Sequence, residues 1–116
     1  MNFEVISLQK LKDFDLGQEF ISEVIQAYVE EIPQYISSAE LGIANNEKDD
    51  VRRILHTLKS HSKTLGMEEV YKKLAFWEAE ILKVPMADFT DDFNFIKERW
   101  SRAVEELKSL KSLDVL

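Results

Sequence analysis

Residues 51–67 read VRRILHTLKSHSKTLGM, and this stretch decides the fold class. On a helix, at about 100° per residue, its apolar side chains gather on one side and its polar side chains cover the other. Five aliphatic residues form the apolar side: Val51, Ile54, Leu55, Leu58 and Leu65. Gly66 then provides the left-handed residue that commonly ends a helix. The stretch predicts an amphipathic helix with one side in a core.

The same spacing of three and four continues on both sides of this stretch, and no run alternates long enough to indicate a strand. The apolar stripes predict helices over residues 18–31, 33–45, 47–65, 67–84 and from Thr90 to about residue 110. Pro33 is expected to end one helix and begin the next, because proline lacks the amide hydrogen that a helix interior needs. A shorter helix from Ser7 would bury three residues, Leu8, Leu11 and Phe14.

Short connections make consecutive helices run antiparallel. We therefore expect an all-α fold, an antiparallel up-down four-helix bundle with one or two additional N-terminal helices. No linker or repeat divides the chain, so residues 1–116 are expected to form one domain, with residues 111–116 as a candidate frayed tail. The aromatic side chains, such as Trp77 and Trp100, follow the helical stripes, which favours core packing over a cofactor pocket.

The overall composition excludes several function classes. The 116 residues include 22 acidic and 15 basic side chains, for a net charge of −7, which argues against nucleic acid or an anionic membrane as a partner. No apolar run approaches the ~20 residues of a membrane span, and the N-terminus does not resemble a signal peptide, so we expect a cytoplasmic protein. Without cysteine the chain has no disulfide, thiolate zinc site or catalytic thiol.

The charge is distributed unevenly along the chain. Residues 51–67 carry four basic side chains and no acid, so the rest of the chain carries −11. His56 lies nearly opposite the apolar side of the predicted helix, among the polar residues Arg52, Lys59, Ser60 and Lys63. An exposed imidazole is largely neutral near pH 7, because its ordinary pKa is ~6.5, and is then a competent nucleophile. The surrounding cations offer a local site for an anion or an acidic partner.

His61 needs a separate interpretation. It lies about 140° around the helix from His56, so the two imidazoles cannot readily bind one metal ion. Its place beside the apolar stripe predicts a partly buried histidine that forms a hydrogen bond inside the bundle. A metal-dependent hydrolase remains a weak alternative, since there is no third histidine although carboxylates are abundant.

Residues 56–66, HTLKSHSKTLG, resemble the signature of histidine-containing phosphotransfer (Hpt) domains, His-x-Leu-Lys-Gly-x-Ser/Ala-x-x-x-Gly. The family is a helical bundle of about this length, with its signature on an exposed helix face in mid-chain. Gly66 matches the terminal glycine and would end the helix. Ser60 replaces the usual glycine but is still small, and Met67 replaces a frequent alanine, which indicates repacking inside the bundle.

The resemblance implies a role for each matching residue. His56 would be the phosphoryl acceptor and donor, and Lys59 would contact the phosphoryl group or the acidic site of the partner. Ser60 would occupy the position where a bulky side chain would block the partner. Lys63 and Arg52 lie on the same face and are expected to assist.

The resemblance also implies partners, namely response-regulator receiver domains and a hybrid sensor histidine kinase. The receiver would supply Mg²⁺, so this chain would need no cofactor of its own and would be a carrier without autonomous catalysis, sufficient as a monomer. A chain that begins at Met1 is expected to be a stand-alone module. The alternative is a non-phosphorylated helical adaptor that docks a receiver or kinase through the same face, using an apolar rim of Leu55 and residues of the 18–31 helix.

Overall fold

The computed structural model describes the backbone of residues 18–112 and the side chains of residues 23–109. This part of the chain contains four α-helices, a short 3₁₀ helix and no strand, which confirms the all-α prediction. The elements are α2 (Gln18–Ala44), α3 (Lys48–Thr64), α4 (Glu68–Glu80), η1 (Met86–Phe89) and α5 (Thr90–Ser112). The helix predicted from Ser7, with Leu8, Leu11 and Phe14, lies outside the described residues, as does the candidate tail beyond Ser112.

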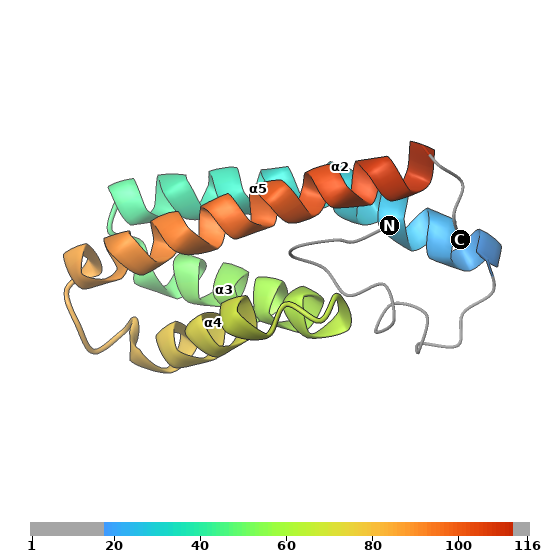
Figure 1. Ribbon diagram of the computed structural model, residues 1–116. Helices are drawn as coiled ribbons and strands as arrows, with labels where there is room; N and C mark the ends of the chain where they lie inside the picture. Colours follow the sequence, from blue (N-terminus) through green and yellow to red (C-terminus); the bar gives the residue numbers. More distant parts are fainter. Residues whose placement is uncertain (1–17, 113–116) are drawn as a thin grey trace.

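The helices pack around one apolar core. α2 and α5 lie side by side, and α3 and α4 form a second pair next to them (Figure 1). α3 contacts both α2 and α4, while α5 contacts α2, α4 and η1. The largest fully buried side chains come from every element: Ile25, Ile32, Leu55, Leu58, Leu65, Leu74, Ile81, Phe89, Ile96, Trp100 and Leu107. Trp77 and Trp100 are both in this core, as their helical spacing predicted.

Helix α2 passes through Pro33 without a break, so the prediction of two separate helices here is wrong. A proline in a helix interior removes one hydrogen bond, here the one that the carbonyl of Val29 would accept. The Pro33 ring itself is exposed, whereas the neighbouring Ile32 and Ile36 are only 1% and 8% exposed. Burial of these flanking side chains stabilises the helix across the proline, because tertiary packing can outweigh local propensity.

The turns on either side of α3 are tight and use left-handed residues. Asn46 has φ 54° after α2, and Gly66 has φ 71° after α3. At the end of α3 the amide of Gly66 donates to the Lys63 carbonyl (3.2 Å), and the amide of Met67 donates to the Ser62 carbonyl (2.9 Å). This pair of bonds satisfies carbonyls that the helix end would leave unpaired. The predicted helix end at Gly66 is thus confirmed. Tight turns therefore connect α3 to α2 at its start and to α4 at its end.

Helix α4 ends at Glu80, earlier than the predicted stop at Val84–Pro85. The chain leaves the helix through turns, and the ammonium of Lys48, at the start of α3, donates to the Val84 carbonyl at 2.5 Å. η1 follows, and α5 begins at Thr90 as predicted. The segment that follows α4 is therefore tied to the first residue of α3, at the opposite end of that helix from Gly66.

Candidate functional site

The exposed face of α3 carries the predicted site. Its opposite side buries Val51, Leu55, Leu58 and Ser62, which fixes the rotation of the helix. His56 consequently points outward, with 65% of its side chain exposed. Arg52, Ser60 and Lys63 are exposed on the same face, whereas Lys59 is only 25% exposed. The predicted accessibility of His56 is confirmed.

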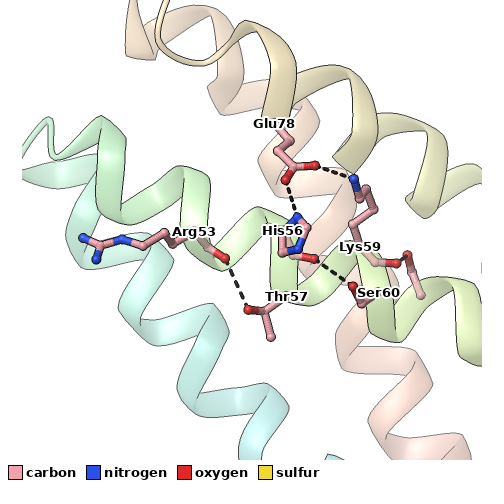
Figure 2. A network of polar contacts seen from close by, with 7 residues as sticks. Arg53, His56, Thr57, Lys59, Ser60 and Glu78 are labelled. Atoms are coloured by element: carbon pink, nitrogen blue, oxygen red, sulfur yellow. Dashed lines mark hydrogen bonds and ion pairs between the residues drawn. The ribbon is translucent and has the colours of Figure 1, made fainter.

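A carboxylate that the sequence prediction missed completes this site. Glu78 of α4 reaches across to α3, where its Oε1 lies 2.5 Å from Nδ1 of His56 and its Oε2 lies 2.5 Å from Nζ of Lys59 (Figure 2). The Glu78 side chain is only 17% exposed. Two groups of α3, one turn apart, are thus held by the two oxygens of one side chain of the neighbouring helix.

The protonation of this network follows from its electrostatics. Burial alone would raise the pKa of the Glu78 carboxyl, but hydrogen bonds from Lys59 and His56, together with their charges, lower that pKa below its ordinary value. Glu78 is therefore ionised at neutral pH and can only accept hydrogen bonds. Nδ1 of His56 must carry the hydrogen that it donates. The lone pair of neutral His56 is consequently on Nε2.

The predicted ring of cations around His56 is only partly present. Lys59 forms an ion pair with Glu78, and Arg53 forms one with Asp50. Within the described part of the chain, Arg52 and Lys63 have no acidic side chain within ion-pair distance. The basic patch counted over residues 51–67 is thus reduced, because acids outside that stretch fold back onto it. Arg52 and Lys63 are the cations left to attract an anion.

Small polar side chains line the remaining face of α3. The hydroxyl of Ser60 donates to the carbonyl of His56 (3.3 Å), so this side chain stays close to its own helix. Ser62, in contrast, is completely buried and donates to the carbonyl of Lys59 at 2.7 Å. Because the Ser60 side chain is small and lies against α3, the surface beside His56 is open to an approaching partner.

His61 lies on the flank of α3 that faces α2. Its ring meets the ring of Tyr28 edge-on, with 4.8 Å between centroids, and that of Tyr35 at 6.2 Å. Burial lowers the pKa of His61 below its ordinary value, although the charge of Glu31 acts in the opposite direction. The prediction of a partly buried histidine is confirmed. Among the described residues, its side chain contacts aromatic rings and not the expected hydrogen-bond partner.

The predicted apolar rim around the site is wrong in its main residue. Leu55 has an exposed fraction of 0% and belongs to the core, so no partner can contact it. Residue 55 precedes His56 by one position, which places it about 100° around the helix and on the buried side. The face around His56 is polar.

Two wider properties of the described residues bear on function. Among the described side chains, those of residues 23–109, no group of three or more His, Cys, Asp or Glu is arranged to hold a metal ion. No helix in the same part of the chain is long and apolar enough to cross a membrane.

Comparison with known families identifies the family of the chain. Residues 23–110 match the Hpt domain family, a match that reaches into every helix described above. The chain belongs to the Hpt family. No curated protein and no solved structure matches it. Hpt domains transfer phosphoryl groups on histidine in phosphorelay signalling, where they interact with receiver domains and kinases as carriers rather than enzymes. The chain has two histidines, of which His56 is exposed and His61 is partly buried.

Proposed function

We propose that the chain is a phosphorelay intermediate in which His56 accepts a phosphoryl group from a receiver-domain aspartate and passes it to another receiver. The observation that supports this assignment most strongly is the exposure of His56, 65% of whose side chain is accessible on the face of α3. His61, the other histidine of the chain, is packed against Tyr28 and Tyr35. A receiver could reach His56 without any rearrangement of the helices.

The proposed transfer needs little chemistry from this chain. The lone pair on Nε2 of His56 attacks the phosphorus of the aspartyl phosphate, the bond from phosphorus to the aspartate oxygen breaks, and the receiver keeps its carboxylate. Phosphoryl transfer has a loose transition state that depends on positioning and charge neutralisation. The receiver would contribute Mg²⁺ and its acidic pocket, and this chain would contribute an aligned nucleophile with no cofactor of its own.

The neighbours of His56 take supporting roles in this proposal. Arg52 and Lys63 would attract the acidic rim of the receiver, since both are exposed and have no ion-pair partner within the described residues. Lys59, whose ammonium pairs with Glu78 in this structure, would contact the phosphoryl group. Ser60 keeps the approach open. Gly66 supports the site indirectly by ending α3.

The proposal extends to the architecture and setting of the domain. We expect the four helices to form an antiparallel up-down bundle preceded by one or two further helices, in a single domain over residues 1–116. The short connections and the packing of α3 between α2 and α4 support this arrangement. A single accessible histidine needs only a monomer. A hybrid sensor kinase and two receivers in the cytoplasm would be its partners.

The adaptor alternative loses the feature that motivated it. An adaptor would dock through apolar contacts, and the residue expected to provide them, Leu55, is buried. The exposed face around His56 is polar and bears an imidazole that docking alone does not require. We therefore retain phosphotransfer as the proposed function.

A transfer assay with matched variants tests this proposal. The chain is mixed with a phosphorylated receiver and Mg²⁺, and acid-labile, alkali-stable phosphate on the chain is followed over time. Wild type and His61→Gln are expected to become labelled, whereas His56→Gln is expected to remain unlabelled. His56 is exposed, so its substitution should leave the fold intact, which circular dichroism checks. Labelling of His56→Gln together with loss of labelling in His61→Gln would contradict the assignment.

A further inference from the structure

Glu78 is placed to act on His56 itself and not only to join two helices. Its side chain is only 17% exposed, and its two carboxylate oxygens lie 2.5 Å from Nδ1 of His56 and 2.5 Å from Nζ of Lys59. A carboxylate so withdrawn from water needs strong partners. It is held in place by Lys59, so its other oxygen is fixed against the imidazole (Figure 2).

We propose that Glu78 is a positioning residue that keeps the proton on Nδ1 of His56 through the whole transfer cycle, and thereby makes the phosphoryl group easy to pass on. This inference rests on the proposed function, since it concerns the second half of the relay. The proposal explains why the Glu78 carboxylate contacts Nδ1, the ring nitrogen that does not take the phosphoryl group. Histidines that act through one ring nitrogen are commonly oriented by a partner on the other.

The bonds and charges of the cycle show what the Nδ1 proton does. When Nε2 of His56 takes the phosphoryl group and Nδ1 keeps its hydrogen, the ring becomes positively charged, and the negative Glu78 stabilises it. On release, the Nε2–phosphorus bond breaks, its electron pair returns to Nε2, and the group that leaves is a neutral imidazole. If Nδ1 had lost its proton, the leaving group would be an imidazolate anion, which is a far poorer one.

The charged groups around the His56 ring lie on α3 and α4. On α3, Lys59 contacts Glu78, and Arg52 and Lys63 lie on the same exposed face. The cations of α3 would favour loss of a proton from the phosphorylated ring, because they repel its positive charge. α4 contributes Glu78. The charge that α2 contributes on the inner flank is Glu31, which acts on His61. Glu78 is therefore the group that opposes this repulsion.

The first test examines the unphosphorylated protein and requires no relay partner. Nitrogen-15 NMR of the imidazole distinguishes a hydrogen on Nδ1 from one on Nε2. Wild type is expected to show His56 with the hydrogen on Nδ1, and Glu78→Ala to shift toward the mixture of free histidine. Glu80→Gln is the matched control, because Glu80 is on the same helix and pairs with Lys83 instead. If the two tautomers of His56 have the same proportions in Glu78→Ala as in wild type, the proposal is overturned.

The second test measures onward transfer from the phosphorylated chain to a fresh receiver. Glu78→Gln keeps an acceptor for the Nδ1 hydrogen but removes the charge. Its onward transfer at about pH 8 is expected to be about tenfold slower than wild type, while the rates converge at lower pH, where Nδ1 stays protonated without help. The pH profile of onward transfer in Glu78→Gln should therefore move to lower pH than that of wild type. A purely structural role of Glu78 would not produce this shift.

The outcomes separate this inference from the proposed function. If wild type takes up no phosphoryl group on His56, the proposed function fails, and the NMR comparison still decides the role of Glu78 in the resting protein. If wild type is labelled normally but Glu78→Gln donates with an unshifted pH profile, the inference is overturned and the relay stands. A folded Glu78→Gln that is slowed equally at every pH also overturns it.

Discussion

The hydroxyl of Ser60 lies against its own helix, where it donates to the carbonyl of His56, and leaves the surface beside the imidazole open. Ser60→Trp should therefore slow phosphoryl transfer from a receiver by about tenfold or more, because an indole would occupy the approach to Nε2. Stability should change by less than ~0.5 kcal/mol, since Ser60 is exposed. Transfer kinetics and urea unfolding measure the two effects.

Ser109→Trp is a matched control for Ser60→Trp, because Ser109 is also exposed on a helix but lies on α5. It should leave transfer unchanged. Equal slowing by both substitutions would show that a bulky surface residue acts through the fold and not through access to His56.

The lowered pKa of His61 predicts how the free energy of unfolding depends on pH. The unfolded chain protonates this histidine at about pH 6.5, whereas the folded chain resists protonation until lower pH, so acid favours unfolding. The free energy of unfolding should fall as pH decreases from about 7 to about 5. His61→Gln should remove much of that slope. Urea unfolding at several pH values measures it.

His56→Gln serves as the comparison for His61→Gln, because it removes the exposed histidine and should retain the slope. The lowered pKa values of Glu78 and Asp92 affect stability mainly below about pH 5, so the slope between about pH 7 and pH 5 reports chiefly on His61. Identical slopes for wild type and His61→Gln would contradict the account of His61.

The residues of the site show how far sequence reasoning reaches. The outward position of His56 and the packing of His61 follow from their angles around a single helix, and both predictions are confirmed. Glu78 could not be found this way, because its contact with His56 spans 22 positions and depends on how α4 rotates against α3. A sequence pattern determines which side of a helix is buried, but not which flank meets which neighbour.

At the scale of the elements, the packing of α2 against α3 has no room for a side chain at Gly42. A Cβ added there would lie 2.8 Å from Cγ2 of Val51, a stiff β-branched side chain. Gly42→Ala should lower the free energy of unfolding by about 1–2 kcal/mol, since overpacking outweighs the better helix propensity of alanine. Equilibrium urea unfolding provides the measurement.

The double variant of Gly42→Ala with Val51→Ala tests the cause. Removing the Val51 methyl groups should relieve the clash, so the double variant should be more stable than the sum of the two single effects predicts. Strict additivity would indicate that Gly42 acts through its backbone alone.

Pro33 shows where element boundaries escape prediction. Local chemistry favours a break at a proline, and the helix would lose a hydrogen bond there. The buried Ile32 and Ile36 on either side keep the chain helical, because their core contacts outweigh that loss. By contrast, the end of α3 at Gly66 was predictable, since a left-handed residue and the end of the apolar stripe coincide.

At the scale of the whole molecule, the net charge of −7 and the exposed cations Arg52 and Lys63 have opposite effects on an acidic receiver. The double reversal Arg52→Glu with Lys63→Glu should slow transfer at low salt by about tenfold and weaken its dependence on salt, because electrostatic steering is lost. Stopped-flow transfer at several ionic strengths measures both.

A second double reversal, Lys83→Glu with Lys108→Glu, changes the net charge equally but lies outside α3, since Lys83 follows α4 and Lys108 is on α5. It should have a much smaller effect on transfer. If both double variants slow transfer alike, net charge governs the encounter and the local cations do not.

The central claim, that His56 carries the phosphoryl group on Nε2, is tested most directly by locating that group. The chain is labelled with nitrogen-15, phosphorylated by a receiver, and examined by phosphorus–nitrogen correlation NMR. The account predicts a single phosphoryl group on Nε2 of His56, while both nitrogens of His61 remain unmodified. A phosphoryl group on His61, or on Nδ1 of His56 where Glu78 now lies, would contradict it.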